Sequence, residues 1–227
     1  MLVRTAADQM PRLNSPSETA LAGGSSPIYW MGEFTYKRDA EIYGEKEPAE
    51  YVYQVKAGAV RSYKLLSDGR RQIGAFHLPG DIFGLTDGEA HWFTTEAVID
   101  TTLWLLKRRS LETEARADSI LSRRLISITT RNLQHAEDHV LLLGRKVALE
   151  KVATFLIEMD KRLTSADVIT LPMGRRDIAD YLGLTVETVS RSLSQLGRAG
   201  ILTFIGDTHH REITILDRTQ LLSLDLQ

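Results

Sequence analysis

Three polar side chains lie close together in the sequence: the carboxylate of Glu187, the hydroxyl of Ser190 and the guanidinium of Arg191. Their spacings of three and four residues place them on one face of a helix, in its first turns. Arginine can donate to O6 and N7 of guanine, and a carboxylate can accept from the amine of cytosine. The set therefore predicts hydrogen bonds to base edges in the major groove of DNA. The alternative is a surface ion pair between Glu187 and Arg191, worth only about 0.2–0.5 kcal/mol.

The same helix has an apolar face on its opposite side. Val189, Leu193 and Leu196 recur at spacings of four and three, so they form a stripe that packs inward. Thr185 precedes the stripe and offers its hydroxyl as the N-cap of the helix. One face therefore fixes the helix, and the other is left to contact a partner.

The flanking sequence extends this helix into a larger unit. A tight turn at Gly183 separates it from an earlier short amphipathic helix, which predicts a helix-turn-helix over about 175–197. Residues 201–205 and 211–216 follow as two strands around the polar turn 206–210. A hairpin in that place predicts a winged helix-turn-helix, with Glu187, Ser190 and Arg191 as the base-reading residues. The residues expected to contact the DNA backbone or to position the helix are Thr185, Val186, Thr188, Arg175, His209 and His210.

A family resemblance supports this interpretation. Residues 177–191, DIADYLGLTVETVSR, are similar to the DNA-binding signature of the CRP/FNR superfamily of bacterial transcription regulators. Residues 187–191, ETVSR, most resemble the FNR and FixK branch. The resemblance implies a homodimer that binds a palindrome of TTGAT and ATCAA separated by four bases. It also implies activation through RNA polymerase, with a role in nitrogen fixation or microoxic gene control.

Composition sets limits on the alternatives. The chain has 227 residues, 43% of them hydrophobic, which is enough for two modest domains. It contains no long apolar run and no secretory leader, so we expect a cytoplasmic protein without membrane contact. Its net charge of −2 gives no global attraction for DNA, so the basic surface must be local.

The chain contains no cysteine. This excludes disulfides, thiolate zinc sites and cysteine-held iron–sulfur clusters. Oxygen-sensing members of the FNR branch hold such a cluster through cysteines, so this chain departs from them.

The N-terminal half reads as an antiparallel β-roll over 28–108, after an irregular arm at 1–27. Its short apolar or alternating runs are 50–55, 59–66, 72–78, 95–99 and 102–106. Residues 55–60 and 76–84 resemble the cyclic-nucleotide-binding-like domain of the same superfamily. The predicted fold class is therefore α+β: a β-roll, connecting and dimerisation helices over 109–144, and a winged helix-turn-helix domain over 145–227.

The resemblance does not extend to cyclic nucleotide binding. Members that bind one carry a glutamate after the Phe-Gly turn and an Arg-Ser pair for the phosphate. Here Leu85 follows Gly84, and Thr94 and Thr95 stand in the later stretch. We therefore predict no cofactor and no cyclic AMP binding. The alternative function is a small-molecule or gas sensor, whose ligand in the β-roll or near the dimer helix controls DNA binding.

A long helix predicted over 118–143 carries two apolar stripes. One stripe repeats every seven residues and predicts a coiled-coil dimer interface, although a buried helix in a monomer is the alternative. The interface residues are Ile126, Thr129, Leu133, Ala136, Val140 and Leu143. The second stripe, Leu121, Leu125 and Ile128, is expected to pack on the β-roll. A following helix over 147–163 turns Val152, Phe155, Leu156 and Met159 inward.

Three further features could support other functions. His135 and His139 have the i,i+4 spacing of helical zinc sites, but no acidic residue clearly completes a site, so solvated or interface histidines are expected and no metal is predicted. His77 and His91 are isolated, which gives no support to an enzyme. The polar turn 67–72 is a candidate contact for RNA polymerase, with a solvated hairpin as its alternative.

Overall fold

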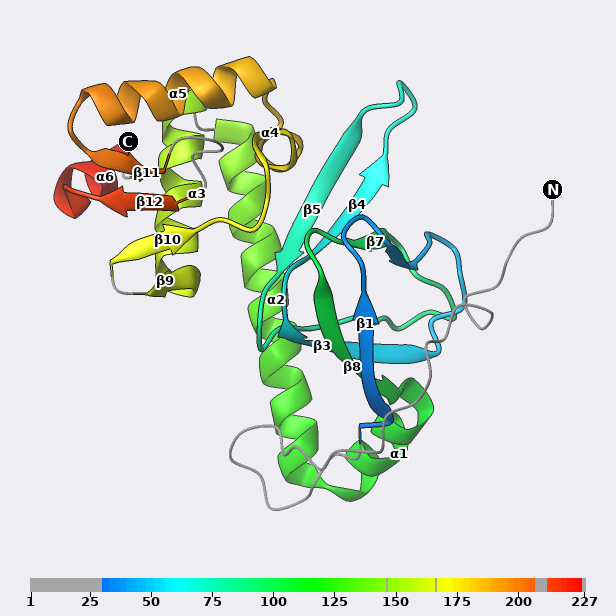
Figure 1. Cartoon of the computed structure of the whole chain (residues 1–227). Coiled ribbons are helices and arrows are strands. Elements are labelled where there is room, and N and C mark those ends of the chain that lie inside the picture. The colour runs from blue at the N-terminus through cyan, green and yellow to red at the C-terminus, as the bar shows by residue number, and fades with distance from the viewer. Residues whose placement is uncertain (1–29, 146, 166, 207–211, 226–227) are drawn as a thin grey trace. The chain divides into compact units, whose positions relative to one another are not determined.

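A computed structural model describes residues 30–145, 147–165, 167–206 and 212–225. Two compact units make up the fold (Figure 1). The first comprises the described residues up to Lys64 together with Ala75–Gln134, and the second comprises Leu65–Gly74 and His135–Gln227. The predicted arm over 1–27 lies outside the described residues. No helix in the described ranges has both the length and the apolar character needed to cross a membrane.

The first unit is the predicted antiparallel β-roll. Its strands are β1 (Gly32–Tyr36), β2 (Glu41–Tyr43), β3 (Tyr51–Ala57), β4 (Val60–Leu65), β5 (Arg71–His77), β6 (Ile82–Phe83), β7 (Thr94–Ala97) and β8 (Thr101–Lys107), and the ends of β4 and β5 belong to the second unit. They form one sheet in the order β1-β8-β3-β6 and another in the order β2-β7-β4-β5. Buried side chains of both sheets meet in one core, which includes Phe34, Tyr43, Val60 and Leu103. Gly58 has φ +95°, and an added Cβ would lie 2.4 Å from Oγ1 of Thr101, so this turn requires glycine.

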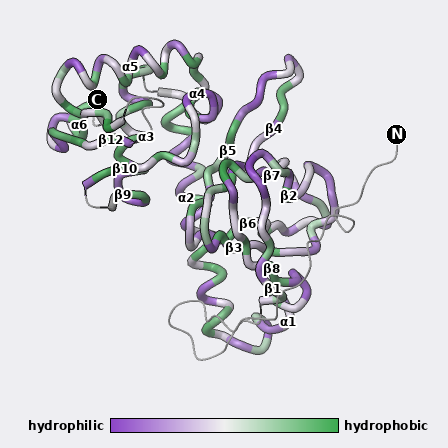
Figure 2. The backbone as a smooth tube through the Cα atoms, in the orientation of Figure 1, coloured by the Kyte–Doolittle hydropathy of each residue, from purple (hydrophilic) through white to green (hydrophobic). Residues whose placement is uncertain are grey.

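Two helices continue the first unit, α1 (Arg108–Ala117) and the N-terminal part of α2 (Ser119–Arg145). Asp118 caps α2, because its carboxylate accepts from the backbone N–H of Ile120 at 2.7 Å. Leu121 is buried in an apolar cluster with Trp30, and Leu125 and Ile128 pack against that cluster. The predicted second stripe of the long helix is therefore confirmed. Hydrophobic and hydrophilic residues alternate along α2 in Figure 2, as expected of an amphipathic helix.

The second unit is a winged helix-turn-helix. Its elements after α2 are α3 (Ala148–Leu163), β9 (Thr164–Ser165), β10 (Val168–Thr170), α4 (Arg175–Leu182), α5 (Val186–Arg198), β11 (Leu202–Ile205), β12 (Glu212–Ile215) and α6 (Arg218–Asp225). The predicted wing is confirmed as the antiparallel pair β11 and β12, in which Thr203 pairs with Thr214. The pair belongs to a sheet of order β11-β12-β10-β9. β9, β10 and α6 had no counterpart in the sequence analysis.

The core of the second unit lies between α3 and the two helices of the helix-turn-helix. Val152, Phe155, Leu156 and Met159 are all buried, which confirms the predicted inward face of α3. They share this core with buried residues of α4 and α5, including Ile178, Leu182, Val189, Leu193 and Leu196. Fully burying a side chain of this kind stabilises a fold by about 1.5–3 kcal/mol, so α5 is held firmly by one face.

Candidate DNA-binding site

The turn between α4 and α5 has the geometry that a helix-turn-helix needs. Gly183 ends α4 in the left-handed region with φ 63°, and its N–H donates to the carbonyl of Ala179. Thr185 is the N-cap of α5, because its hydroxyl accepts from the backbone N–H of Thr188 at 3.2 Å. The predicted N-cap is confirmed. A left-handed glycine followed at once by a capped helix start fixes the direction in which α5 leaves the turn.

The burial of α5 divides the helix into two faces. Val189, Leu193 and Leu196 are at most 2% exposed, so they form the face that packs inward. Val186, Glu187 and Arg191 are exposed on the other side of the helix, near its N-terminus. A carboxylate and a guanidinium thus stand within one turn of each other on an exposed helix end, as a recognition helix requires.

The predicted base-reading residues differ in what they contact. Glu187 and Arg191 form no ion pair with each other, and no other side-chain partner occurs for either one among the described residues. The surface ion pair considered above is therefore not formed. Ser190 is half-buried and accepts a hydrogen bond from Nη1 of Arg175 at 2.8 Å. Glu187 and Arg191 are thus available to an external partner, whereas the hydroxyl of Ser190 already has one protein partner.

The residues predicted to position the helix lie around its start. Val186 is the first residue of α5, and the hydroxyls of Thr185 and Thr188 are 2.9 Å apart. Arg175 is the first residue of α4 and is half-buried. His209 and His210 lie outside the described residues. The structure therefore places four of the six at the helix-turn-helix itself.

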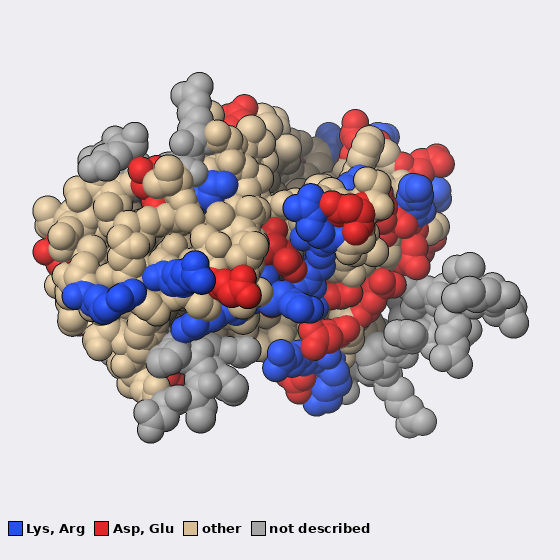
Figure 3. All heavy atoms as spheres, turned by 90° about the horizontal axis from the view of Figure 1, so that it is seen from above, with Lys and Arg blue, Asp and Glu red and all other residues tan. Residues whose placement is uncertain are grey.

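Two carboxylates of α4 form ion pairs with Arg71, a contact that the sequence did not predict. Arg71 lies 2.5 Å from Asp177 and 2.8 Å from Asp180, as measured between charged atoms. All three side chains are largely buried. The pairing with Arg71 therefore offsets part of the negative charge that Asp177 and Asp180 bring to α4. In Figure 3, which looks down on the side where α5 lies in Figure 1, basic side chains form a broken row with some acidic ones among them.

Arg71 belongs to the polar turn that was a candidate polymerase contact. Residues 67–70 at its tip are exposed, whereas Arg71 and Gln72 are engaged with α4. The amide of Gln72 donates to the backbone carbonyls of Asp180 and Tyr181. The exposed tip at 67–70 therefore remains open to a partner, whereas Arg71 and Gln72 do not.

His135 and His139 hold elements of the second unit together. Nε2 of His135 lies 2.9 Å from the carboxylate of Glu158 on α3, which also accepts from Arg162. His139 is buried and stacks on the ring of Tyr181, with centroids 4.1 Å apart. Its Nε2 donates a hydrogen bond to the backbone carbonyl of Tyr181. The two histidines therefore join α2 to α3 and α4. Within the described ranges, no three or more metal-ligating side chains lie close enough to hold an ion.

Burial and hydrogen bonding shift the pKa values of His139 and Glu158. Burial lowers the pKa of His139 below its ordinary value, although the hydrogen bond to Tyr181 opposes the shift, so the ring is neutral at pH 7. Burial also raises the pKa of Glu158, but the hydrogen bonds and charges of His135 and Arg162 outweigh it. The pKa of Glu158 therefore lies below its ordinary value, and its carboxylate is ionised.

The positions that would hold a cyclic nucleotide in the β-roll are filled by other contacts. Leu85 packs against the apolar cluster around Trp30. Oγ1 of Thr94 accepts from the backbone N–H of Glu45, and Oγ1 of Thr95 lies 3.0 Å from Oγ of Ser62. Leu85, Thr94 and Thr95 thus have contacts within the protein, and the absence of cyclic nucleotide binding stays a prediction.

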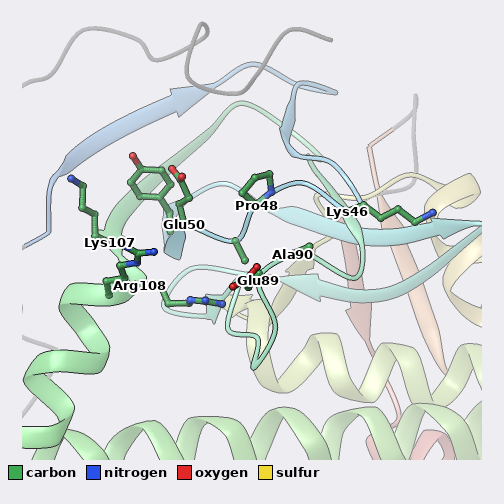
Figure 4. Close-up of a pocket in the computed structure, with 10 residues that line it drawn as sticks. Lys46, Pro48, Glu50, Glu89, Ala90, Lys107 and Arg108 are labelled. Atoms are coloured by element: carbon green, nitrogen blue, oxygen red, sulfur yellow. The ribbon is translucent and has the colours of Figure 1, made fainter.

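A separate groove of about 670 Å³ opens near the start of β3 and the end of β8 (Figure 4). The charged residues that border it are Lys46, Glu50, Glu89, Lys107, Arg108 and Arg109. Arg108 is engaged in the protein, since it donates to the carbonyl of Gly88 and pairs with Glu112. None of the predicted DNA-contacting residues lies in this groove.

The predicted dimer stripe of α2 is open to solvent. Ile126, Leu133 and Val140 are 65%, 58% and 68% exposed, and Thr129 and Ala136 between them are also exposed. Leu143 differs, because it is half-buried and lies beside Gly183. Exposed apolar residues at heptad spacing are typical of a helix that pairs with another helix.

Comparison with known proteins agrees with this architecture. Residues 33–118 match the model of the cyclic nucleotide-binding domain, and residues 150–224 match that of the Crp-like helix-turn-helix domain. The nitrogen fixation regulation protein FixK of Rhizobium meliloti (strain 1021) is 43% identical over 168 residues, which cover 74% of this chain and 76% of that protein. The chain belongs to the FixK family. It is thus a member of the CRP/FNR superfamily, as the resemblance implied.

Two other FixK proteins extend the match. FixK of Azorhizobium caulinodans is 40% identical over 225 residues, covering 97% of this chain and 86% of that protein. The solved structure of FixK2 from Bradyrhizobium japonicum has 63% sequence identity and a TM-score of 0.82, over 85% of this chain and 96% of that one. These FixK relatives are transcription regulators rather than enzymes. The predicted fold class is confirmed over both domains.

Proposed function

We propose that this chain is a DNA-binding transcription activator of the FixK type, which binds a TTGAT-N4-ATCAA-like palindrome as a homodimer. The observation that carries the proposal is the outward face of α5. Glu187 and Arg191 stand there without a side-chain partner among the described residues, on a helix whose opposite face is buried. DNA is the partner that uses both groups, because the edges of a G·C pair offer two acceptors to arginine and a donor to a carboxylate.

The half-site TTGAT contains a single G·C pair. Arg191 would bind O6 and N7 of its guanine, and Glu187 would accept from the amine of a cytosine, each by direct contact in the major groove. Thr185 and Thr188 lie at the helix start, where hydroxyls and backbone N–H groups meet phosphates. Reading the site thus needs only the N-terminal turns of α5.

A palindrome calls for a protein with twofold symmetry. The exposed stripe of Ile126, Leu133 and Val140 offers the surface on which two copies of α2 would pair. The two copies of α5 would then enter the major groove on one side of the DNA, about one helical turn apart.

Activation would need a contact with RNA polymerase, and the exposed hairpin tip 67–70 is the candidate surface. By analogy with the named FixK relatives, the regulated genes belong to nitrogen fixation or microoxic metabolism. Such a regulator acts in the cytoplasm, where the bacterial chromosome lies.

The test is a binding titration with the full-length protein and labelled duplexes, without added ligands. The intact palindrome should bind tightly, whereas spacers of three or five bases should weaken binding because they rotate one half-site about the DNA axis. Equal affinity for all spacers would refute a rigid dimer on a palindrome. Binding that appears only after a small molecule is added would instead favour the ligand-controlled sensor.

A further inference from the structure

Arg175 and Ser190 lie on different helices of the helix-turn-helix, yet their side chains are bonded. Arg175 begins α4, and Ser190 lies in the second turn of α5. Nη1 of the guanidinium donates to Oγ of the serine at 2.8 Å. Both side chains are half-buried. The bond therefore links the start of one helix to the DNA-facing part of the other.

This bond restricts what the hydroxyl of Ser190 can do. A serine hydroxyl has one proton to donate and two lone pairs that accept, whereas a guanidinium only donates. Arg175 therefore takes one accepting position, and the serine proton must point away from it. Donation from a cation also strengthens the hydroxyl as a donor, because hydrogen bonds in a chain polarise one another. The Ser190 hydroxyl is therefore disposed to act mainly as a hydrogen-bond donor towards any further partner.

The remaining N–H groups of the Arg175 guanidinium can still donate to another partner. No carboxylate pairs with this guanidinium among the described residues. The two acidic side chains of its own helix, Asp177 and Asp180, are held by Arg71 instead. The charge of Arg175 therefore stays available for an anionic partner such as a DNA phosphate.

We propose that Arg175 is a positioning residue of the DNA-reading surface, which orients the hydroxyl of Ser190 as a donor towards a base acceptor while its other N–H groups contact phosphate. The base acceptors that fit are O4 of thymine, O6 of guanine and N7 of either purine; the amines of adenine and cytosine, which only donate, fit less well. The inference rests on the proposed function, because it assumes that α5 reads DNA. It goes further by making Arg175 contribute to sequence discrimination as well as to affinity.

The test is a double-mutant cycle with the full-length protein. Arg175→Ala, Ser190→Ala and the double variant are titrated with the palindrome and with duplexes in which each base pair of the half-site is changed in turn. Both single variants should relax discrimination at the same base pair. The double variant should discriminate no worse there than either single one, with a coupling of about tenfold per half-site, as expected for a hydrogen bond to a charged group.

Two variants serve as matched controls. Arg176→Ala removes the neighbouring arginine, which is exposed and has no side-chain partner among the described residues. Ser194→Ala removes a hydroxyl one turn further along α5, which donates only to the backbone carbonyl of Ser190. Neither should change discrimination at the base pair that Ser190 faces. Unfolding curves for every variant show whether each one is folded.

Two results would overturn the inference while leaving the proposed function intact. One is additivity of the two single variants at every base pair. The other is an Arg175→Ala protein that loses affinity equally on all duplexes, with a salt slope lower by about one unit, as for a phosphate contact alone. A wild-type protein that fails to prefer the palindrome refutes the proposed function instead, and the inference falls with it.

Discussion

Replacing Leu133 and Val140 by glutamate should turn the protein into a monomer. Both side chains are apolar, and they are 58% and 68% exposed in the single chain. In a pair of α2 helices they would meet their own copies across the twofold axis. Glutamate at these positions removes the apolar contact and brings like charges together. Both effects weaken the pairing of the two α2 helices.

The size of the effect follows from the exposed area. Fully burying a leucine or valine side chain contributes about 1.5–3 kcal/mol, so burying the exposed part of each contributes about 1–2 kcal/mol. Four such side chains are lost from a dimer, which weakens it by about 4–8 kcal/mol, or at least a thousandfold in the dissociation constant. A micromolar solution of the variant should therefore contain monomers.

Sedimentation equilibrium measures this directly, and a titration with the palindrome measures its consequence. Gln134→Glu is the control, because it also adds a glutamate at an exposed position of α2, but outside the stripe. The control should remain a dimer that binds the palindrome. A wild-type protein that is monomeric both alone and on DNA, or a double variant that stays dimeric, would refute the assignment of the stripe.

Three further predictions concern base reading, ligands and pH. Arg191→Ala should lose about 1–3 kcal/mol of DNA-binding free energy per half-site and relax the preference for the G·C pair. Arg198→Ala, at the other end of α5, should leave that preference unchanged. If titrations show that Arg191→Ala keeps the preference, Arg191 does not belong to the reading surface. Calorimetry with cyclic AMP and cyclic GMP should give no binding heat, because Leu85 and Thr95 replace the ribose and phosphate ligands; a micromolar isotherm would contradict this. The pKa of His139 lies below its ordinary value of 6.5, so the unfolded chain binds the proton more readily and stability falls as the pH drops below that value. His139→Gln should flatten this part of a urea-midpoint profile, and an unchanged profile would show that another group causes it.

The sequence predicted the parts of the fold that depend on local pattern. The turn at Gly183, the N-cap at Thr185 and the apolar stripe of α5 are signals within one short segment, and each has its predicted place in the structure. The wing and α3 were also found, because their apolar residues repeat with the period of a strand or a helix. β9 and β10 were missed since they have only two and three residues, too few to show a period.

Contacts between distant parts of the sequence could not be predicted in the same way. Arg71 is separated from Asp177 and Asp180 by 106 and 109 residues, and nothing in either segment indicates the pairing. The spacing of His135 and His139 suggested at most a metal site, because their partners on α3 and α4 become neighbours only after folding. The base-reading and dimer residues remain predictions. They are supported by exposure and, within the part of the chain that the structure describes, by the lack of side-chain partners for Glu187 and Arg191.

The most direct test of the central claim, that two copies of α5 read a palindrome, is a nuclease footprint. The purified full-length protein is placed on a DNA fragment that carries the TTGAT-N4-ATCAA sequence, in air and without added ligands. We predict protection of both half-sites together, at one protein concentration, and its loss when the G·C pair of either half-site is changed. A folded protein that leaves the palindrome unprotected, or that protects one half-site independently of the other, would contradict the account.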